Sequence, residues 1–143
     1  MCNVIVSYMK FQTGVKVLAH DTEGRFLVIK RAQPLLDGTS GTWDIPGGRR
    51  EPEDKTLVGT AERETWHETG ARLWQPEPFH IQIFTPAEDL TVVRFTFIAV
   101  ATGNVVLSDE HCDYKVLWPE RALQLPLDPF TREVFEMALQ QGY

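Results

Sequence analysis

Two apolar segments near the N-terminus flank a short polar turn. Residues 14–19 (GVKVLA) and 25–30 (RFLVIK) are typical of β-strands, and residues 21–24 (DTEG) between them are typical of a tight turn. This pattern predicts a β-hairpin. The following residues 32–42 are rich in glycine, proline and small polar side chains, and they are therefore predicted to form a loop.

The middle of the chain has the hydrophobic repeat of an amphipathic helix. With about 100° of rotation per residue, Leu57, Ala61 and Thr65 fall on one side of this helix, which is expected to face the core. We predict that the helix begins at position 54 or 55 and covers the residues up to 69. Gly70 then supplies the residue type that commonly ends a helix in the left-handed conformation.

The remaining segments predict further strands and one more helix. Strands are expected at residues 43–45, 79–85, 91–101 and 114–118. The last helix is expected to begin at Pro129, with Asp128 as its N-cap. Strands and helices are mixed without regular βαβ alternation. The predicted fold class is therefore α/β in the broad sense (α+β), a mixed β-sheet with helices on its faces and not a Rossmann fold.

The composition suits a small globular protein. The chain has 143 residues, of which 43% are hydrophobic and 24% charged, and this predicts one domain over residues 1–143 with a single core. No run of about 18 apolar residues is present, and the first residues lack the basic and apolar parts of a secretory signal. Cys2 and Cys112 lie far apart outside any CxxC pattern, which indicates reduced thiols. We therefore expect a cytoplasmic protein with no membrane span.

The charge balance is acidic, and this changes the choice of partners. The formal net charge is −6, from 20 acidic and 14 basic residues, whereas non-specific binding to nucleic acid needs a basic surface. We therefore expect no nucleic-acid partner. An acidic protein can still bind an anionic phosphate when metal ions mediate the contact, and a local cluster of carboxylates would hold those ions.

A pair of carboxylates on the central helix offers such a cluster. Glu64 and Glu68 are four residues apart, so their side chains stack on one side of the helix and repel each other. A cation is needed to offset this repulsion. Arg63 contributes one charge, and a divalent metal would contribute more, because carboxylate oxygens are the preferred ligands of Mg²⁺ and Mn²⁺.

These residues are part of a longer pattern that resembles the Nudix box. The box reads G-x5-E-x7-R-E-U-x-E-E-x-G-U, where U is apolar, and this chain has Gly47-Gly48, Asp54 and then residues 63–71 (RETWHETGA). The lead-in, residues 41–46 (GTWDIP), is also similar to the family's usual approach to the box. The order of the flanking elements agrees over nearly the whole chain. The resemblance therefore implies a Nudix-like α/β/α sandwich with a mixed β-sheet.

The resemblance also implies an activity and a set of site residues. The expected activity is metal-dependent hydrolysis of a phosphoric anhydride in a nucleoside diphosphate linked to another moiety, most simply a nucleoside triphosphate, with Mg²⁺ or Mn²⁺ as cofactor. The metal site would include Glu64, Glu68, His67 and Gly48, and Arg63 would stand beside Glu64 in the catalytic group. The later acidic segment, residues 108–114 (SDEHCDY), supplies Glu110 as the candidate general base. Arg31 and Arg49 are candidates for contact with the substrate phosphates.

Two departures from the box affect these expectations. The spacing from Gly48 to Arg63 is one residue longer than in the pattern, so the early acid is Asp54, or Glu53 if the insertion lies before it. His67 stands where the family has the first glutamate of its pair. Neutral imidazole binds Mn²⁺, Co²⁺ or Zn²⁺ but suits Mg²⁺ poorly. The exchange predicts a shift in metal preference, the loss of one metal or weaker turnover.

Other interpretations remain at the level of sequence. A non-catalytic Nudix-fold module that binds a nucleotide or a protein is consistent with His67, and a structural domain with a chance match to the box is a third class. A zinc site made of His67, His111 and Cys112 has the right residue types but no paired ligand spacing. The tryptophans are expected to lie in the core, and the chain is expected to be a monomer or a homodimer.

Overall fold

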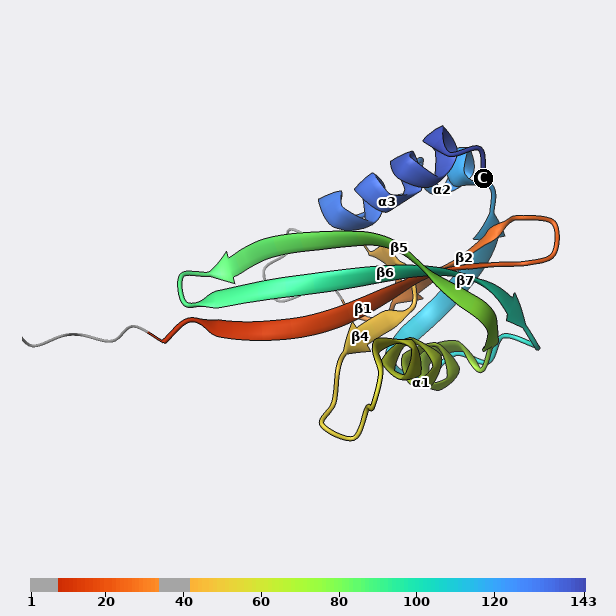
Figure 1. Ribbon diagram of the computed structural model, residues 1–143. Helices are drawn as coiled ribbons and strands as arrows, with labels where there is room; N and C mark the ends of the chain where they lie inside the picture. The colour runs from red at the N-terminus through yellow and green to blue at the C-terminus, as the bar shows by residue number, and fades with distance from the viewer. Residues whose placement is uncertain (1–7, 34–41) are drawn as a thin grey trace, which may run out of the picture.

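A curled mixed β-sheet forms the centre of the structure, which is a computed structural model describing residues 8–33 and 42–143 (Figure 1). Within these residues the sheet has seven strands with the path β3-β2-β1-β6-β5, while β4 pairs with β1 and β7 pairs with β2. The strands are β1 (Lys10–His20), β2 (Phe26–Arg31), β3 (Trp43–Asp44), β4 (Gly47–Arg49), β5 (Arg72–Ala87), β6 (Leu90–Thr102) and β7 (His111–Leu117). The helices are α1 (Leu57–Thr69), α2 (Pro119–Ala122) and α3 (Pro129–Gln140).

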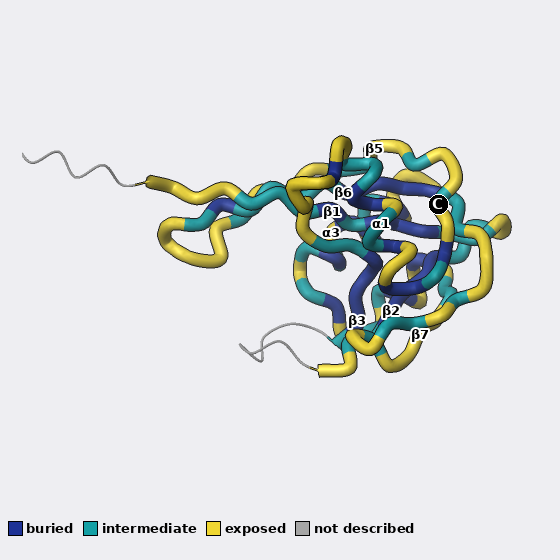
Figure 2. The backbone as a smooth tube through the Cα atoms, turned by 90° about the horizontal axis from the view of Figure 1, so that it is seen from below, coloured by how far each residue is buried: buried dark blue, intermediate teal, exposed yellow. Residues whose placement is uncertain are grey.

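The helices cover opposite faces of the sheet, α1 on one face and α2 with α3 on the other (Figure 1). The pleat of β1 explains how one strand serves both layers, because successive side chains point to opposite faces. Val15 and Val17 pack in the cluster that contains Ala61 of α1, whereas Leu18 packs in the cluster that contains Phe135 of α3. The inner strands are accordingly buried along their central parts (Figure 2). The α/β/α sandwich with a mixed sheet is therefore confirmed.

The predicted hairpin is confirmed as β1 and β2. The side chain of Asp21 accepts hydrogen bonds from the backbone N–H groups of Glu23 and Arg25 at 3.0 and 2.9 Å, which closes the turn. Beyond this turn the two strands separate, and β1 pairs along its whole length with β6 in parallel, from Lys10 opposite Leu90 onward. The mixed character of the sheet comes from this one parallel pair.

Helix α1 begins later than its hydrophobic repeat suggested. Thr56 is the N-cap and accepts from the N–H of Gly59 at 2.9 Å, whereas the expected start was position 54 or 55. Asp54 takes no part in the helix because its carboxylate closes the preceding turn, where it accepts from the N–H of Glu51 at 2.9 Å. At the other end Gly70 has a φ of 67° and donates to the carbonyl of Trp66, as predicted.

Several elements differ from the sequence-based expectation. Strand β4 and helix α2 were not predicted, and β5 is far longer than the predicted strand at 79–85. Three prolines interrupt the pattern of β5, and β5 is an edge strand, where a missing N–H costs no ladder hydrogen bond. Its register shifts at three places against β6. The strands near 91–101 and 114–118 and the last helix with its Asp128 N-cap are present close to the expected positions.

The tryptophans correct an expectation about the core. Trp43 is buried, but the other three expose 44 to 59% of their surface: Trp66, Trp74 and Trp118. Trp66 stacks instead against the guanidinium of Arg72, 4.6 Å from the ring centroid, so the partner of this ring is a surface cation.

No helix within residues 8–33 and 42–143 is long and apolar enough to cross a membrane. Cys112 is an exposed free thiol, whereas Cys2 and most of the predicted loop at 32–42 lie outside the described residues.

Candidate active site

The first part of the site is the contact between the acidic side of α1 and the glycine strand β4. The N–H of Gly47 donates to Oε1 of Glu68 at 2.8 Å. A Cβ on Gly48 would lie 2.6 Å from the carboxyl carbon of Glu64, and a Cβ on Gly47 would lie 2.1 Å from the carbonyl oxygen of Val15. A side chain at Gly47 would clash with backbone, and one at Gly48 would displace the carboxylate of Glu64. The two box carboxylates therefore lie directly over the backbone of β4.

Asp54 and Arg63 form the ion pair that joins the loop before α1 to the helix. Arg63 donates from Nε and Nη2 to the two carboxylate oxygens of Asp54 at 2.9 and 2.8 Å, a bidentate arrangement. Thr60 adds a hydrogen bond of 2.9 Å to the same carboxylate. Hydrogen bonds from Arg63 are the main reason why the pKa of Asp54 lies well below its usual range. Asp54, and not the exposed Glu53, thus occupies the place of the early box acid.

Arg63 also fixes the position of Glu64. Its Nη1 donates to Oε1 of Glu64 at 2.6 Å, and its Nη2 donates to the backbone carbonyl of Arg49 at 3.1 Å. The hydrogen bonds to Asp54 are the main reason why the pKa of Arg63 is raised, and the guanidinium therefore remains charged. Glu64 is therefore held between the guanidinium and Gly48. In this structure Arg63 acts as a positioning residue.

Glu68 differs from Glu64 in its environment. Its relative exposure is 6%, whereas Glu64 is half-buried. Burial raises the pKa of Glu68 to about 7, and the negative charges of Glu64 and Asp44 add to this effect. The N–H of Gly47 and the charge of Lys16 act in the opposite direction without cancelling it. A buried carboxylate with a raised pKa favours the binding of a cation or of a proton.

A cavity of about 380 Å³ opens beside Glu68 and brings together residues from six elements or their adjoining loops. Its lining residues are Lys16, Arg31, Ala32, Gln33, Asp44, Gly47, Glu68, Asp109, Glu110 and His111. Three of them could hold a metal ion, because one ligand atom each from Glu68, Glu110 and His111 lies within 4.8 Å of the others. The Nε2 atom of His111 lies 3.5 Å from Oε2 of Glu68.

Two cations on the wall of this cavity share one buried carboxylate. Lys16 Nζ and Arg31 Nη2 lie 2.6 and 2.5 Å from Oδ2 of Asp44. Burial alone would raise the pKa of Asp44, but the charges of Lys16 and Arg31 outweigh it and hold the pKa well below its usual range. Asp44 also accepts from Thr131 of α3 at 3.2 Å. The anchored Lys16 and Arg31 give an otherwise acidic cavity a positive side, which suits a phosphate group.

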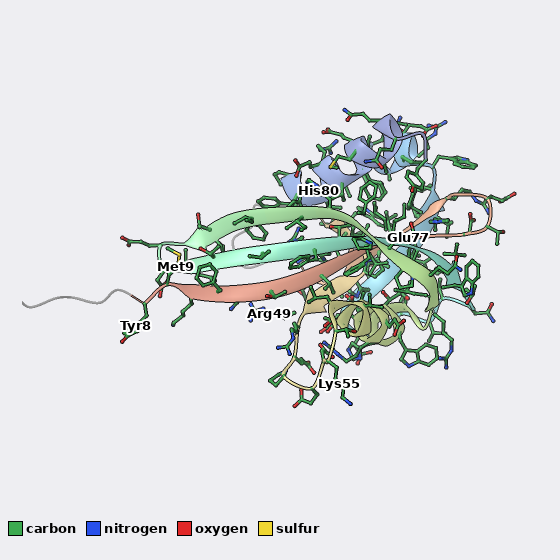
Figure 3. The ribbon with its side chains drawn as sticks, viewed as in Figure 1. Tyr8, Met9, Arg49, Lys55, Glu77 and His80 are labelled. Atoms are coloured by element: carbon green, nitrogen blue, oxygen red, sulfur yellow. The ribbon has the colours of Figure 1, made fainter. Side chains whose placement is uncertain are left out.

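The structure does not bring all the sequence candidates together. Arg31, Glu68 and Glu110 line the cavity. Glu64 and Gly48 do not line it; they pack against each other, and Gly48 follows the lining residue Gly47. The side chain of Arg49 is exposed, and Arg49 and Lys55 lie around the loop between β4 and α1 (Figure 3). His67 is exposed and lines a different surface hollow with Trp66. Neither His67 nor Cys112 belongs to the metal-ligating group found among the described residues.

Sequence reasoning assigned no role to two charged residues of the cavity, Lys16 and Asp44. A signal for Lys16 was present, since it is a charged residue in the middle of an apolar strand, where both faces of the sheet are covered. Asp44 lies in a buried dipeptide strand between Trp43 and Ile45, which is equally unusual for a carboxylate. His111 was part of the acidic segment at 108–114 and of the zinc alternative, but it was not among the expected metal ligands of the Nudix site.

Comparison with known proteins gives the class of the fold and then the family. The MutT NUDIX hydrolase from Burkholderia pseudomallei has the same fold, with a TM-score of 0.70 and 23% identity over 89% of this chain and 97% of that chain. The MutT protein from Methanosarcina mazei Go1 gives a TM-score of 0.72 and 26% identity over 93% of this chain and 96% of that chain. Residues 10–138 match the NUDIX domain, so the chain belongs to the Nudix hydrolase family.

A curated relative supports this assignment over a shorter segment. A MutT-like protein from Streptomyces ambofaciens is 43% identical over 51 residues, which are 36% of this chain. The match spans 29% of the length of that relative. It therefore supports the family of the matched segment and does not extend to the activity of the whole relative.

Proposed function

We propose that this protein is a metal-dependent pyrophosphohydrolase that cleaves a nucleoside diphosphate linked to another moiety, most simply a nucleoside triphosphate or related nucleotide. One observation carries the proposal: the cavity combines an acidic end at Glu68 and Glu110 with a cationic side at Lys16 and Arg31. An acidic end alone suits a cation, and a cationic side alone suits a phosphate. Their combination suits a phosphate chain with its bound metal.

The residues present fit a divalent cation. Glu68 is buried and lies beside Glu110 and His111, and Glu64 is fixed over Gly48 close by. These groups offer the oxygen ligands that Mg²⁺ and Mn²⁺ prefer. A bound divalent cation would neutralise charge on the pyrophosphate oxygens and promote ionisation of the attacking water.

The protein's own side chains divide the remaining tasks. Arg31 and Lys16 are held by Asp44 and would orient the phosphate chain without collapsing onto the carboxylates. Glu110 is an exposed carboxylate at the cavity wall, and we assign it the role of base that accepts the proton of the attacking water. Arg63 keeps Glu64 in place. The cavity volume of about 380 Å³ lies in the range of about 300 to 1,000 Å³ of small-molecule sites.

The test is a nucleotide panel assayed with Mg²⁺ and Mn²⁺ in parallel, with products identified by mass. Glu68→Gln and Glu64→Gln should each lower kcat by roughly a hundredfold or more, as expected when an electrostatic group in the site is lost. Glu62→Gln is the matched control, because Glu62 lies on the same helix but is exposed beside Trp66 and Arg72. Wild-type turnover in both site variants would contradict the proposal.

A non-catalytic nucleotide-binding module is the second candidate. It is favoured by one observation, the exposed His67 in place of a box glutamate. This alternative predicts that a nucleotide raises the melting temperature while no product forms with either metal. The retained Arg63, Glu64 and Glu68 and their ordered contacts favour the enzyme.

A further inference from the structure

The box of this chain lacks one carboxylate, and the structure does not replace it at the same position. His67 is exposed on α1 and lines a hollow with Arg63, Trp66 and Val106, whereas Glu68 turns toward Gly47 and the cavity. The ligand-type group that faces Glu68 comes instead from the start of β7. That group is the imidazole of His111.

Glu68 needs a cation that the described residues do not provide directly. Within residues 8–33 and 42–143, no lysine or arginine lies within 4.0 Å of its carboxylate. Lys16 and Arg31 are nearby but are bound to Asp44. A buried carboxylate without a paired charge is costly. His111, with its Nε2 atom at 3.5 Å, is the basic side chain nearest to it in this part of the chain.

The imidazole of His111 is itself buried and only partly satisfied. Its side chain is 7% exposed, and its Nδ1 atom is buried with no hydrogen-bond partner. Buried polar atoms normally have a partner. The nitrogen that faces the carboxylate of Glu68 is the other one, Nε2, at 3.5 Å, and Nδ1 lies on the other side of the ring. A metal ion bound by Nε2 and by the carboxylate of Glu68 would join the two side chains, because such ions accept imidazole and carboxylate ligands together.

Backbone hydrogen bonds fix His111 in this position. Its N–H donates to the carbonyl of Ser108 at 3.1 Å, and the N–H of Ser108 donates to the carbonyl of Glu68 at 3.1 Å. On the other side the N–H of Ala32 donates to the carbonyl of Glu110 at 2.9 Å. The loop before β7 is thus attached both to the end of α1 and to the end of β2. This attachment holds the imidazole and Glu110 on the wall of the same cavity, with their ligand atoms within 4.8 Å of each other.

We propose that His111 supplies a nitrogen ligand to the divalent cation, together with Glu68 and one oxygen of Glu110, and so takes over the donor that the box lacks at His67. The second carboxylate oxygen of Glu110 stays available to accept the proton of the attacking water. This inference rests on the proposed function and specifies its metal. One nitrogen among oxygen ligands favours Mn²⁺ or Co²⁺ over Mg²⁺, which prefers an all-oxygen octahedron. The competing role for His111 is that of a positioning residue that donates a hydrogen bond to Glu68.

Pulsed electron paramagnetic resonance of bound Mn²⁺ separates these two roles. A directly bound imidazole couples its nitrogen spin to Mn²⁺, and protein labelled with ¹⁵N-histidine identifies the signal as histidine. We expect the coupling in the wild type and in His67→Gln, and its loss in His111→Gln. The affinity for Mn²⁺ should fall roughly tenfold or more in His111→Gln, since even groups outside the ligand shell change metal affinity by about 10- to 100-fold. A glutamine retains hydrogen-bonding capacity, so a purely positioning role would be largely preserved.

Each other outcome has a defined meaning. Coupling that persists in His111→Gln and disappears in His67→Gln assigns the ligand to His67 and overturns the inference. Hydrolysis with Mn²⁺ bound but without histidine coupling in the wild type overturns the inference and leaves the proposed function intact. Absence of both Mn²⁺ binding and hydrolysis overturns both. If His111→Gln fails to fold, the wild type and His67→Gln still decide, because the chain has four histidines and only His111 belongs to the ligating group of the described residues.

Discussion

At the scale of single residues, the site depends on carboxylates that share a helix but differ in surroundings. Glu64 is held by the Arg63 guanidinium, and Asp54 is held by the same guanidinium from the other side. Glu68 has one backbone donor and a buried position instead. Glu64 is therefore an anion held in place by a guanidinium, whereas Glu68 is a buried carboxylate that favours the binding of a cation.

The raised pKa of Glu68 gives a prediction for the metal-free protein. Its pKa rises from about 4.5 to about 7 on folding, so between these pH values the native state binds more protons than the unfolded state. Stability is then lost as pH rises from about 4.5 to 7, because the buried carboxylate must ionise without a partner. Asp44 has a lowered pKa, so its contribution to folding stability is lost only as the pH falls below its ordinary pKa. The two groups therefore act in separate pH windows.

Glu68→Gln isolates this effect. The amide oxygen can still accept from Gly47 but carries no charge, so the metal-free variant should be more stable than the wild type by about 1 to 3 kcal/mol at pH 8, at about 1.4 kcal/mol per pKa unit. The two proteins should be nearly equal at pH 5. Urea denaturation at both pH values in the presence of a chelator measures the difference. A variant that is equally stable or less stable at pH 8 would contradict the burial argument.

At the scale of elements, the close contact between α1 and β4 explains why two adjacent glycines are present. The two positions differ in what a side chain would meet. A Cβ on Gly48 would meet the end of the flexible Glu64 side chain at 2.6 Å, whereas a Cβ on Gly47 would meet the backbone of Val15 at 2.1 Å. A flexible side chain can move aside, but a strand in the middle of a sheet cannot.

The glycine pair therefore predicts two different phenotypes. Gly48→Ala should fold with a loss of stability of about 1 kcal/mol or less, because Glu64 can rotate away, but its turnover should fall at least tenfold because Glu64 leaves its place. Gly47→Ala should lose about 2 kcal/mol or more, as expected when a strand is forced away from its neighbour. Thermal melting and steady-state kinetics of the two variants provide the comparison. Equal losses of stability in both would show that the β4 geometry is not the reason for the pair.

At the scale of the whole molecule, the cavity exists because elements distant in sequence meet in the folded chain. Its walls come from β1, the end of β2, β3, β4, the end of α1, and the start of β7 with the loop before it. A cation bound between these elements links them and should act on the global folding equilibrium. The protein should therefore be stabilised as a unit by its cofactor.

This linkage predicts the response of the melting temperature to metal. Mn²⁺ should raise the melting temperature in a concentration-dependent way, with a stabilisation of about 2.7 kcal/mol at a free concentration one hundred times Kd. Glu68→Gln should blunt this rise, and Glu62→Gln, with its exposed side chain on the same helix, should not. Differential scanning calorimetry over a Mn²⁺ series tests the expectation. A wild-type melting temperature independent of millimolar Mn²⁺ would contradict the metal site.

The sequence by itself determined most of the secondary structure and the local part of the site. Hydrophobic periodicity predicted the first hairpin, the central helix and the last helix, because these elements are formed by contacts between residues close in the chain. The pairing of Arg63, Glu64 and Glu68 on one helix also follows from spacing alone. Residues of a single helix keep a fixed relation whatever surrounds them.

The tertiary structure decided what the chain pattern left open. Strand β4 and the parallel pairing of β1 with β6 depend on partners far along the chain, and glycines carry no local strand signal. The burial of Glu68, the anchoring of Lys16 and Arg31 by Asp44, and the approach of His111 all come from the meeting of distant elements. Spacing defines which side of a helix a residue occupies. Only the packing of that helix against other elements defines whether the residue meets water, a charge or an imidazole.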